Sequence, residues 1–288
     1  MSTNGSCLLR IRSDLQSQSG AIARIGQVVL KSPHRVRNLS IEALARLCRT
    51  SAATVYRFCR ELGYEGYREF QLDLAAAVAS SSVVSLEEFV EGASVRSILH
   101  GVFEYNRQGL TDTEKMLSEA EITRVARHIY RSRKSILLGL GSSALVARRG
   151  EEVFLSLGLT AIAITDPYTQ IFATENVGPR DIVIGISHTG RTRQIVEAIQ
   201  TARRKGARTV AITNYPRSPL AESSDFSLVT AFREHRINAA VSSSIIPQLG
   251  IIASIHFILG SWAGSKANKL ATEAEQRAQK ILRASVRK

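Results

Sequence analysis

The sequence predicts a multidomain protein: an all-α helix-turn-helix unit, followed by an α/β unit with a doubly wound, five-stranded parallel sheet. Residues 40–62 hold two short amphipathic helical patterns joined by about three residues, the spacing of a helix-turn-helix. From residue 135 onward, five apolar runs of strand length alternate with helical stretches, as in sheets with right-handed helical crossovers. At 288 residues the chain is long enough for each unit to bury a core.

Two serines mark the starts of the paired helices. Ser40 and Ser51 stand directly before the apolar-periodic residues, where a hydroxyl oxygen can accept from a free backbone amide, and Gly63 follows the second helix. The turn carries Arg49 where such motifs often carry glycine. A left-handed conformation there would cost roughly 1–2 kcal/mol.

The second of these helices is the candidate DNA-reading element. Its N-terminal side chains are short enough for close approach to a groove, and an arginine there can reach guanine edges or phosphates. The candidate contact residues are Ser51, Ala52, Ala53, Thr54 and Arg57, with Arg60 and Arg68 for the flanking backbone. The alternative is a solvated basic helix. The net charge of +13 suits a polyanionic partner but is nonspecific, and residues 1–80 hold 11 Lys/Arg against 6 Asp/Glu.

Composition and apolar patterning place the domain boundaries. Residues 75–85 are small and low in charge, which indicates a linker, and a helical pattern follows over about 94–117 for packing or dimerisation. We expect a helix-turn-helix domain over 1–78, a linker and connecting helix over 79–110, an α/β domain over 111–264 and a C-terminal helix over 265–288. An apolar helix over 239–262 should be kinked or divided by Pro247.

The predicted strands are residues 135–140, 159–165, 181–187, 209–213 and 226–229. The third runs into a turn rich in hydroxyls, residues 187–192, and then into a helix. This order places Ser187, Thr189 and Thr192 beside free backbone amides at a positive helix end, where a phosphate fits. The alternative is an ordinary loop without a ligand. The first strand is followed by a similar glycine-rich turn with Ser142 and Ser143, so two loops could converge on one ligand.

The first loop also allows a nucleotide-binding interpretation. Gly139, Gly141 and Ala144 have the spacing of a weak dinucleotide fingerprint, with Asp166 as a ribose partner. The hydroxyl-rich second loop favours a small phosphorylated ligand instead.

Both units resemble one known family. Residues 39–45 and 50–70 closely resemble the N-terminal domain of the RpiR family of bacterial transcriptional regulators, and the two loops resemble the sugar isomerase (SIS) domain over roughly residues 111–262. That family joins the two domains in this order. The resemblance implies a regulator, not an enzyme, controlled by a phosphorylated sugar or sugar acid. It places effector contacts on Ser142, Ser143, Ser187, His188, Thr189, Gly190 and Thr192.

The alternative function is a phosphosugar isomerase with an accessory basic helical domain. Isomerisation needs a positioned base. The candidates Glu151, Glu152, Glu175, His235 and His256 lie in no motif that identifies a base, and Glu151 and Glu152 are more simply a solvated pair. The segment Ser244-x-x-x-Gln248 matches the SIS pattern only loosely, because Ile245 stands where a basic residue is usual, so the resemblance assigns no effector contact to this segment.

The remaining expectations concern partners and location. The three cysteines have no metal-ligand spacing and suit reduced core positions, so we expect no metal and no cofactor. No window of about twenty residues is uninterruptedly apolar and no signal pattern opens the chain, which predicts a cytoplasmic protein without a membrane partner. The expected partners are duplex DNA with a palindromic operator, a phosphorylated sugar, and a second copy in a homodimer or homotetramer.

Overall fold

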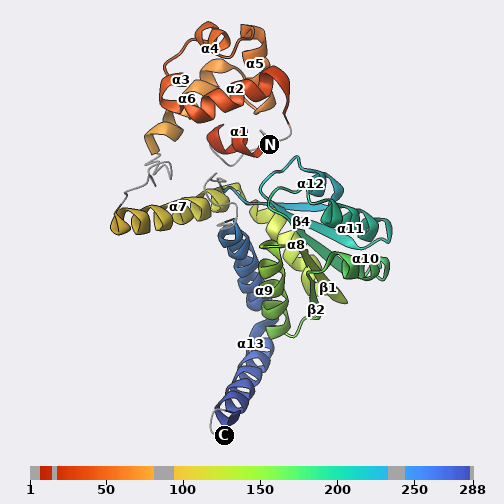
Figure 1. Ribbon diagram of the computed structural model, residues 1–288. Helices are drawn as coiled ribbons and strands as arrows, with labels where there is room; N and C mark the ends of the chain where they lie inside the picture. The colour runs from red at the N-terminus through yellow and green to blue at the C-terminus, as the bar shows by residue number, and fades with distance from the viewer. Residues whose placement is uncertain (1–6, 15–17, 81–93, 233–243, 286–288) are drawn as a thin grey trace.

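The computed structural model describes residues 7–14, 18–80, 94–232 and 244–285 (Figure 1). Six helices form the N-terminal unit around a core of its own. They are α1 (Cys7–Asp14), α2 (Gly20–Lys31), α3 (Pro33–Val36), α4 (Ile41–Leu47), α5 (Ala52–Glu61) and α6 (Tyr67–Ser80). The three cysteines, Cys7, Cys48 and Cys59, are buried in this core, as predicted.

The helix-turn-helix prediction is confirmed in α4 and α5. Ser40 Oγ accepts from Ala43 N at 3.2 Å, and Ser51 Oγ accepts from Thr54 N at 3.2 Å, so both predicted caps are made. Arg49 lies between the two helices with φ of 50°, the one positive value at a non-glycine residue in the described part of the chain. The expected left-handed turn is therefore present without a glycine.

The predicted linker is shorter than its composition suggested. Residues 75–80 belong to α6, because alanine favours helix and the face with Leu74, Ala77 and Val78 is buried in the core. Residues 81–93 lie outside the described part. The connecting helix is α7 (Val95–Met116), capped by Ser94, and it continues past the boundary expected at residue 110.

The second unit contains five parallel strands, in the order β2-β1-β3-β4-β5. They are β1 (Lys134–Gly139), β2 (Ala161–Ile164), β3 (Asp181–Ile186), β4 (Arg208–Thr213) and β5 (Phe226–Val229). All five lie where the sequence predicts them, within two residues at each end. The buried β3 pairs with β1 from Asp181 opposite Lys134 and with β4 from Ile182 opposite Arg208.

Helices cover both faces of the sheet (Figure 1). One face packs against α8 (Glu119–Arg131), α9 (Ser143–Ser156) and α13 (Ile245–Ser285). The other packs against α10 (Pro167–Glu175), α11 (Arg193–Arg204) and α12 (Pro219–Ser223). This arrangement is the predicted doubly wound fold.

Helix α8 is docked on the sheet through its first turn. Ser118 Oγ accepts from Glu121 N at 3.4 Å, which is half of a capping box. Glu121 Oε1 does not complete that box, because it accepts from Ser227 N in β5 at 2.9 Å. The carboxylate therefore joins α8 to the edge strand.

Helix α13 differs from the prediction at its start. It begins at Ile245, so Pro247 lies in the first turn, where its missing N–H is not needed, and the expected kink does not arise there. The helix then continues across the boundary expected at residue 264, while residues 239–243 lie outside the described part. Its stretch Ile245–Trp262 is apolar and long enough to cross a membrane by length and composition. Within this stretch, Ile251, Ile255 and Leu259 are fully buried against the domain core, and 33% of the stretch is buried in total.

Candidate functional site

The strand order places the two polar loops side by side. β1 and β3 are neighbours, but the chain leaves β1 through α9 across one face and leaves β3 through α11 across the other. In open α/β sheets, ligands bind beyond the carboxyl ends of strands at such a reversal. Residues 140–143 follow β1 and residues 187–192 follow β3, so the structure brings the predicted loops together. We call these two segments the polar cradle.

Hydroxyl groups organise the second loop. Ser187 Oγ lies 2.9 Å from Thr192 Oγ1 and accepts from Gly190 N at 3.2 Å, while Thr189 Oγ1 accepts from Arg191 N at 3.2 Å. The amides of residues 190 and 191 are therefore bonded within the loop, so the prediction of free backbone amides is wrong at these two positions. The hydroxyls and the helix end remain as the groups able to meet a ligand.

Gly190 is required by close packing. Its φ is +60°, and a Cβ there would overlap the side chains of Ser218 and Thr213. Thr213 Oγ1 and Asn214 N both donate to the carbonyl of His188, at 3.1 and 2.9 Å. β4 therefore fixes the loop that follows β3.

The first loop is held equally close to its strand. A Cβ on Gly139 would overlap the carbonyl of Ser143, so glycine lets α9 begin directly against β1. Ser143 is buried and Ser142 is exposed at the N-cap. Gly141, in the same loop, has a positive φ of +56°.

The two helices that start at the cradle lack side-chain caps. The N-cap hydroxyls of Ser142 on α9 and Thr192 on α11 make no cap hydrogen bond. Side chains cap α4, α5, α7, α8, α10 and α12, whereas α2 and α3 in the N-terminal unit, like α9 and α11, have no side-chain cap. A helix N-terminus carries partial positive charge. The cradle combines two such ends with five hydroxyl side chains, those of Ser142, Ser143, Ser187, Thr189 and Thr192. That combination suits an anion with several oxygens.

His188 and Arg191 lie within the second loop. The His188 ring contacts the Tyr215 ring edge to face, with centroids 5.8 Å apart, and the Arg191 side chain is exposed. The histidine is half-buried beside Tyr215, which no sequence motif indicated.

Asp166, the residue that the nucleotide-binding interpretation assigned to a ribose, has a structural role. Asp166 Oδ1 accepts from Thr169 N at 2.7 Å and from Thr169 Oγ1 at 2.8 Å, so it caps α10. These hydrogen bonds lower the pKa of the Asp166 carboxyl. A carboxylate already used as a cap is poorly placed to bind a ribose.

Three of the candidate bases have structural partners. Glu152 pairs with Arg149 at 3.0 Å, and Glu175 pairs with Lys205 at 2.7 Å. His256 Nδ1 lies 3.2 Å from the carbonyl of Val153, where α13 packs on α9. His235 lies outside the described residues, and no cluster of possible metal ligands occurs in the described part of the chain.

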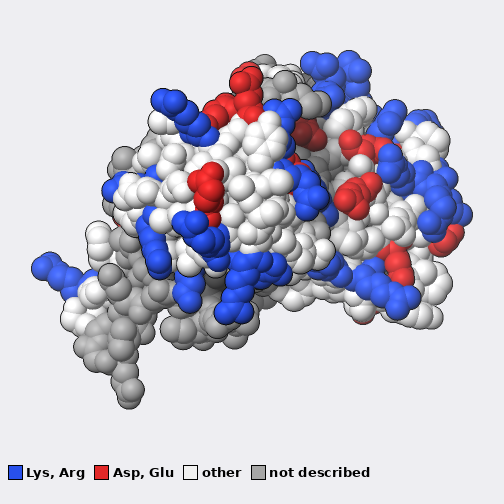
Figure 2. Space-filling view, turned by 90° about the horizontal axis from the view of Figure 1, so that it is seen from above, with Lys and Arg blue, Asp and Glu red and all other residues white. Residues whose placement is uncertain are grey.

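The helix-turn-helix presents most of its predicted contact residues to solvent. Ala53, Arg57, Arg60 and Arg68 are exposed, and Ala52 is half-buried. Ser51 Oγ and Thr54 Oγ1 lie 2.9 Å apart, so these two hydroxyls are bonded to each other in the free protein. Figure 2 shows Lys and Arg spread over this end of the molecule rather than gathered into one patch.

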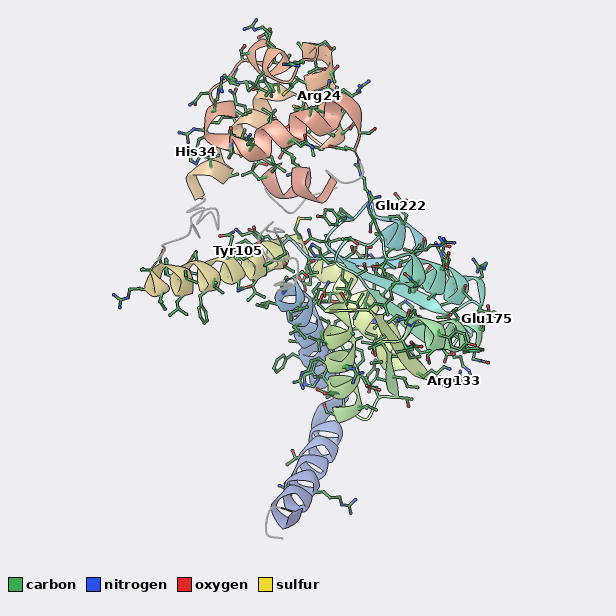
Figure 3. All side chains as sticks on the ribbon, in the orientation of Figure 1. Arg24, His34, Tyr105, Arg133, Glu175 and Glu222 are labelled. Carbon is green, nitrogen blue, oxygen red and sulfur yellow. The ribbon has the colours of Figure 1, made fainter. Side chains whose placement is uncertain are left out.

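Arg24 on α2 was not identified from the sequence, yet it holds the turn of the motif (Figure 3). Its Nε and Nη2 atoms donate to the carbonyls of Cys48 and Arg49, at 3.3 and 3.4 Å. These carbonyls belong to the segment with the left-handed residue, so the guanidinium stabilises the strained turn. Because Arg24 lies 25 residues before Arg49, no local pattern could indicate this contact.

Residues 5–81 match the family described as "Helix-turn-helix domain, rpiR family", and residues 128–255 match the SIS domain. An uncharacterized HTH-type transcriptional regulator from Caldanaerobacter subterraneus is 32% identical over 86% of this chain and 88% of its own length. The HTH-type transcriptional regulator HexR from Pseudomonas aeruginosa is 31% identical over 77% of each chain.

Two solved structures share the fold. The Vibrio vulnificus NanR protein complexed with ManNAc-6P has a TM-score of 0.61 at 23% identity, covering 95% of this chain and 98% of that one. The sugar isomerase domain of an RpiR transcription factor from Sphaerobacter thermophilus has a TM-score of 0.58 at 25% identity, covering 62% of this chain and 98% of that one.

Proposed function

The chain belongs to the RpiR family of helix-turn-helix transcriptional regulators, and we propose that a phosphorylated sugar or sugar acid bound in the polar cradle controls its binding to DNA. The observation that carries this proposal is the pair of uncapped helix ends, α9 and α11, that meet beside the cradle hydroxyls. The proposed effector contacts are Ser142, Ser143, Ser187, His188, Thr189, Gly190 and Thr192.

The chemistry of the cradle suits the phosphate group of the effector. Hydroxyl groups donate to phosphate oxygens, and the two helix dipoles favour negative charge without requiring a buried cation. The solved structure of NanR, which shares the fold, is of a complex with ManNAc-6P. This supports a phosphosugar as the class of effector for the present chain.

The helix-turn-helix supplies DNA binding, and we propose that α5 is the element that reads the groove. The proposed contacts are Ser51, Ala52, Ala53, Thr54 and Arg57 for the groove, with Arg60 and Arg68 for the phosphates. Arg57 is exposed one turn from the start of α5, a position from which recognition helices reach base edges.

We further propose a homodimer, acting in the cytoplasm on a palindromic operator. The support is an exposed apolar row on α7, whose first residues, 94–100, are all exposed. The row consists of Val95, Ile98, Leu99, Val102, Phe103 and Leu110. An uncovered helix of this kind is marginally stable in water, and a second α7 offers the same apolar face.

Sedimentation of Val102→Asp against wild type tests the proposed homodimer, since a charge in the row should favour monomers.

The family membership makes this chain a regulator and not an enzyme. The contacts of Glu152, Glu175 and His256 agree with that assignment, because these candidate bases are engaged in ion pairs or helix packing.

The test is a panel of aldose, ketose and aldonic acid phosphates screened by thermal shift with the full chain. A ligand at about 100 times its Kd stabilises a protein by about 2.7 kcal/mol, which produces a measurable rise in Tm. Each hit is then tested for a change in DNA affinity at fixed salt. NMR of the same mixtures should show no aldose–ketose interconversion. Turnover that disappears on mutation of a carboxylate would favour the isomerase instead.

A further inference from the structure

Gln248, in the first turn of α13, is a fully buried amide without a hydrogen-bond partner. Its exposed fraction is 0%, and neither Oε1 nor Nε2 is bonded in the structure. More than nine in ten buried polar groups in proteins have a partner, so an amide with neither atom paired calls for an explanation. The neighbouring buried positions on this helix face, Ile251, Ile252 and Ile255, are all isoleucine. Packing alone would be served by an apolar residue at 248 as well.

The packing of α13 on α9 shows where this amide lies. Gly150 of α9 faces the Ile252 side chain, Val153 faces His256, and Leu157 faces Gly260. The two helices therefore run in the same direction, and each of these α13 residues lies beside the α9 residue that is about 102 positions earlier in the sequence. Extending this register back by one turn places Gln248 beside the first turn of α9, which begins at Ser143.

The direction of the side chain follows from helix geometry. Gln248 precedes Ile251 and Ile252 by three and four residues, so it projects from the same face, toward α9 and the sheet. Helical side chains also lean toward the N-terminus of their own helix. Because α13 and α9 start at the same edge of the sheet, this lean carries the amide toward the polar cradle at that edge.

We propose that the Gln248 amide binds the sugar portion of the effector, while the cradle holds its phosphate; this rests on the proposed function. An amide offers one acceptor oxygen and two N–H donors, which suits a hydroxyl, carbonyl or acylamino group. It does not carry a charge that would oppose the phosphate. The amide also does not ionise near neutral pH, so its role is recognition and selectivity.

The test compares full-length wild type with Gln248→Met, which keeps the length and volume of the side chain but removes its hydrogen bonds. Inorganic phosphate and a panel of hexose and hexonic acid 6-phosphates are titrated by calorimetry. The matched control is Ile255→Met, on the same buried face two turns further along. A second variant, Ser187→Ala, reports on the phosphate portion alone.

Gln248→Met should weaken the best sugar phosphate about tenfold or more and leave inorganic phosphate affinity unchanged. Ser187→Ala should weaken both ligands. Gln248→Met should also unfold at the same or a higher temperature without ligand, because it removes an unpaired polar group. If Gln248→Met binds every sugar phosphate as the wild type does, or loses both ligand classes equally together with stability, the inference is overturned. Failure of wild type to bind any phosphate probe overturns the proposed function as well.

Discussion

Arg133 and Asp181 form a two-bond ion pair at the start of the central strand β3. The guanidinium Nε and Nη2 donate to Oδ1 and Oδ2 at 2.9 and 2.8 Å (Figure 3). The carboxylate is 2% exposed and also accepts from Gly178 N at 3.0 Å. Burial alone would raise the pKa of Asp181, but the bonds from Arg133 and Gly178 outweigh it, and the pKa is lowered.

Asp181→Asn should therefore destabilise the α/β unit by roughly 1.5–3 kcal/mol near pH 7, the usual range for hydrogen bonds to a charged group. Urea unfolding followed by fluorescence measures this, since the single tryptophan, Trp262, lies in α13 and contacts Tyr130. The control is Glu197→Gln, which removes an exposed i,i+4 pair with Arg193 and should change stability little.

The effect of Asp181→Asn should depend on pH in a defined direction. A carboxyl whose pKa is lower in the folded protein stabilises it fully above the unfolded pKa of about 4. That contribution is lost as the pH falls through the folded pKa. The stability gap between wild type and variant should thus stay constant from pH 5 to 8 and shrink below pH 4. A gap that grows on acidification would contradict this account.

Arg49→Gly should stabilise the helix-turn-helix unit by about 0.5–1 kcal/mol. Glycine removes the cost of a side chain at φ of 50°, although the unfolded chain gains some entropy. Arg46→Gly is the matched control, because it removes the same charge inside α4 and should destabilise by about 0.5–1 kcal/mol. Thermal unfolding followed by circular dichroism distinguishes them, and equal effects of the two variants would rule out strain at residue 49.

Arg57→Ala should weaken operator binding by roughly 1–3 kcal/mol and scrambled DNA much less, if Arg57 reads a base. The control is Arg131→Ala, which removes an exposed positive charge from α8 in the other unit. Fluorescence anisotropy measures the DNA affinity of both variants. The salt concentration is kept fixed because contacts to phosphates make this affinity salt-dependent. A uniform loss on specific and scrambled DNA would instead assign Arg57 to the phosphate backbone.

The strands and loops were predictable because their signals are local. A buried parallel strand such as β3 is a continuous apolar run, and a glycine-hydroxyl turn directly after it indicates the loop. The hydrogen bonds of Arg24 and the burial of the Gln248 amide were not predictable, because each depends on how distant helices pack. The start of α13 and the helical residues 75–80 were misjudged for a related reason. Proline is accepted in a first helical turn, and an alanine-rich segment becomes helix when one face is buried.

The last prediction concerns coupling between the cradle and DNA. The cradle and α5 lie in separate units, so direct contact between effector and DNA does not explain control. A ligand that binds two arrangements of the protein unequally shifts their populations, and such couplings typically amount to about 1–3 kcal/mol. By linkage, a sugar phosphate that weakens operator binding must itself bind more weakly, by the same factor, when operator is present.

Ser187→Ala combined with Thr189→Ala should abolish this response while leaving ligand-free operator affinity nearly unchanged. The hydrogen bonds of Ser187 Oγ and Thr189 Oγ1 lie within residues 187–192, so the loss of these hydroxyls should not disturb the helix-turn-helix core. Operator affinity is measured with and without the identified sugar phosphate, for wild type and the double variant, at one salt concentration. A Thr201→Ala variant, on the same α11 but outside the cradle, should respond as wild type does. If the double variant still binds the effector and responds normally, residues 187–192 are not the sensor.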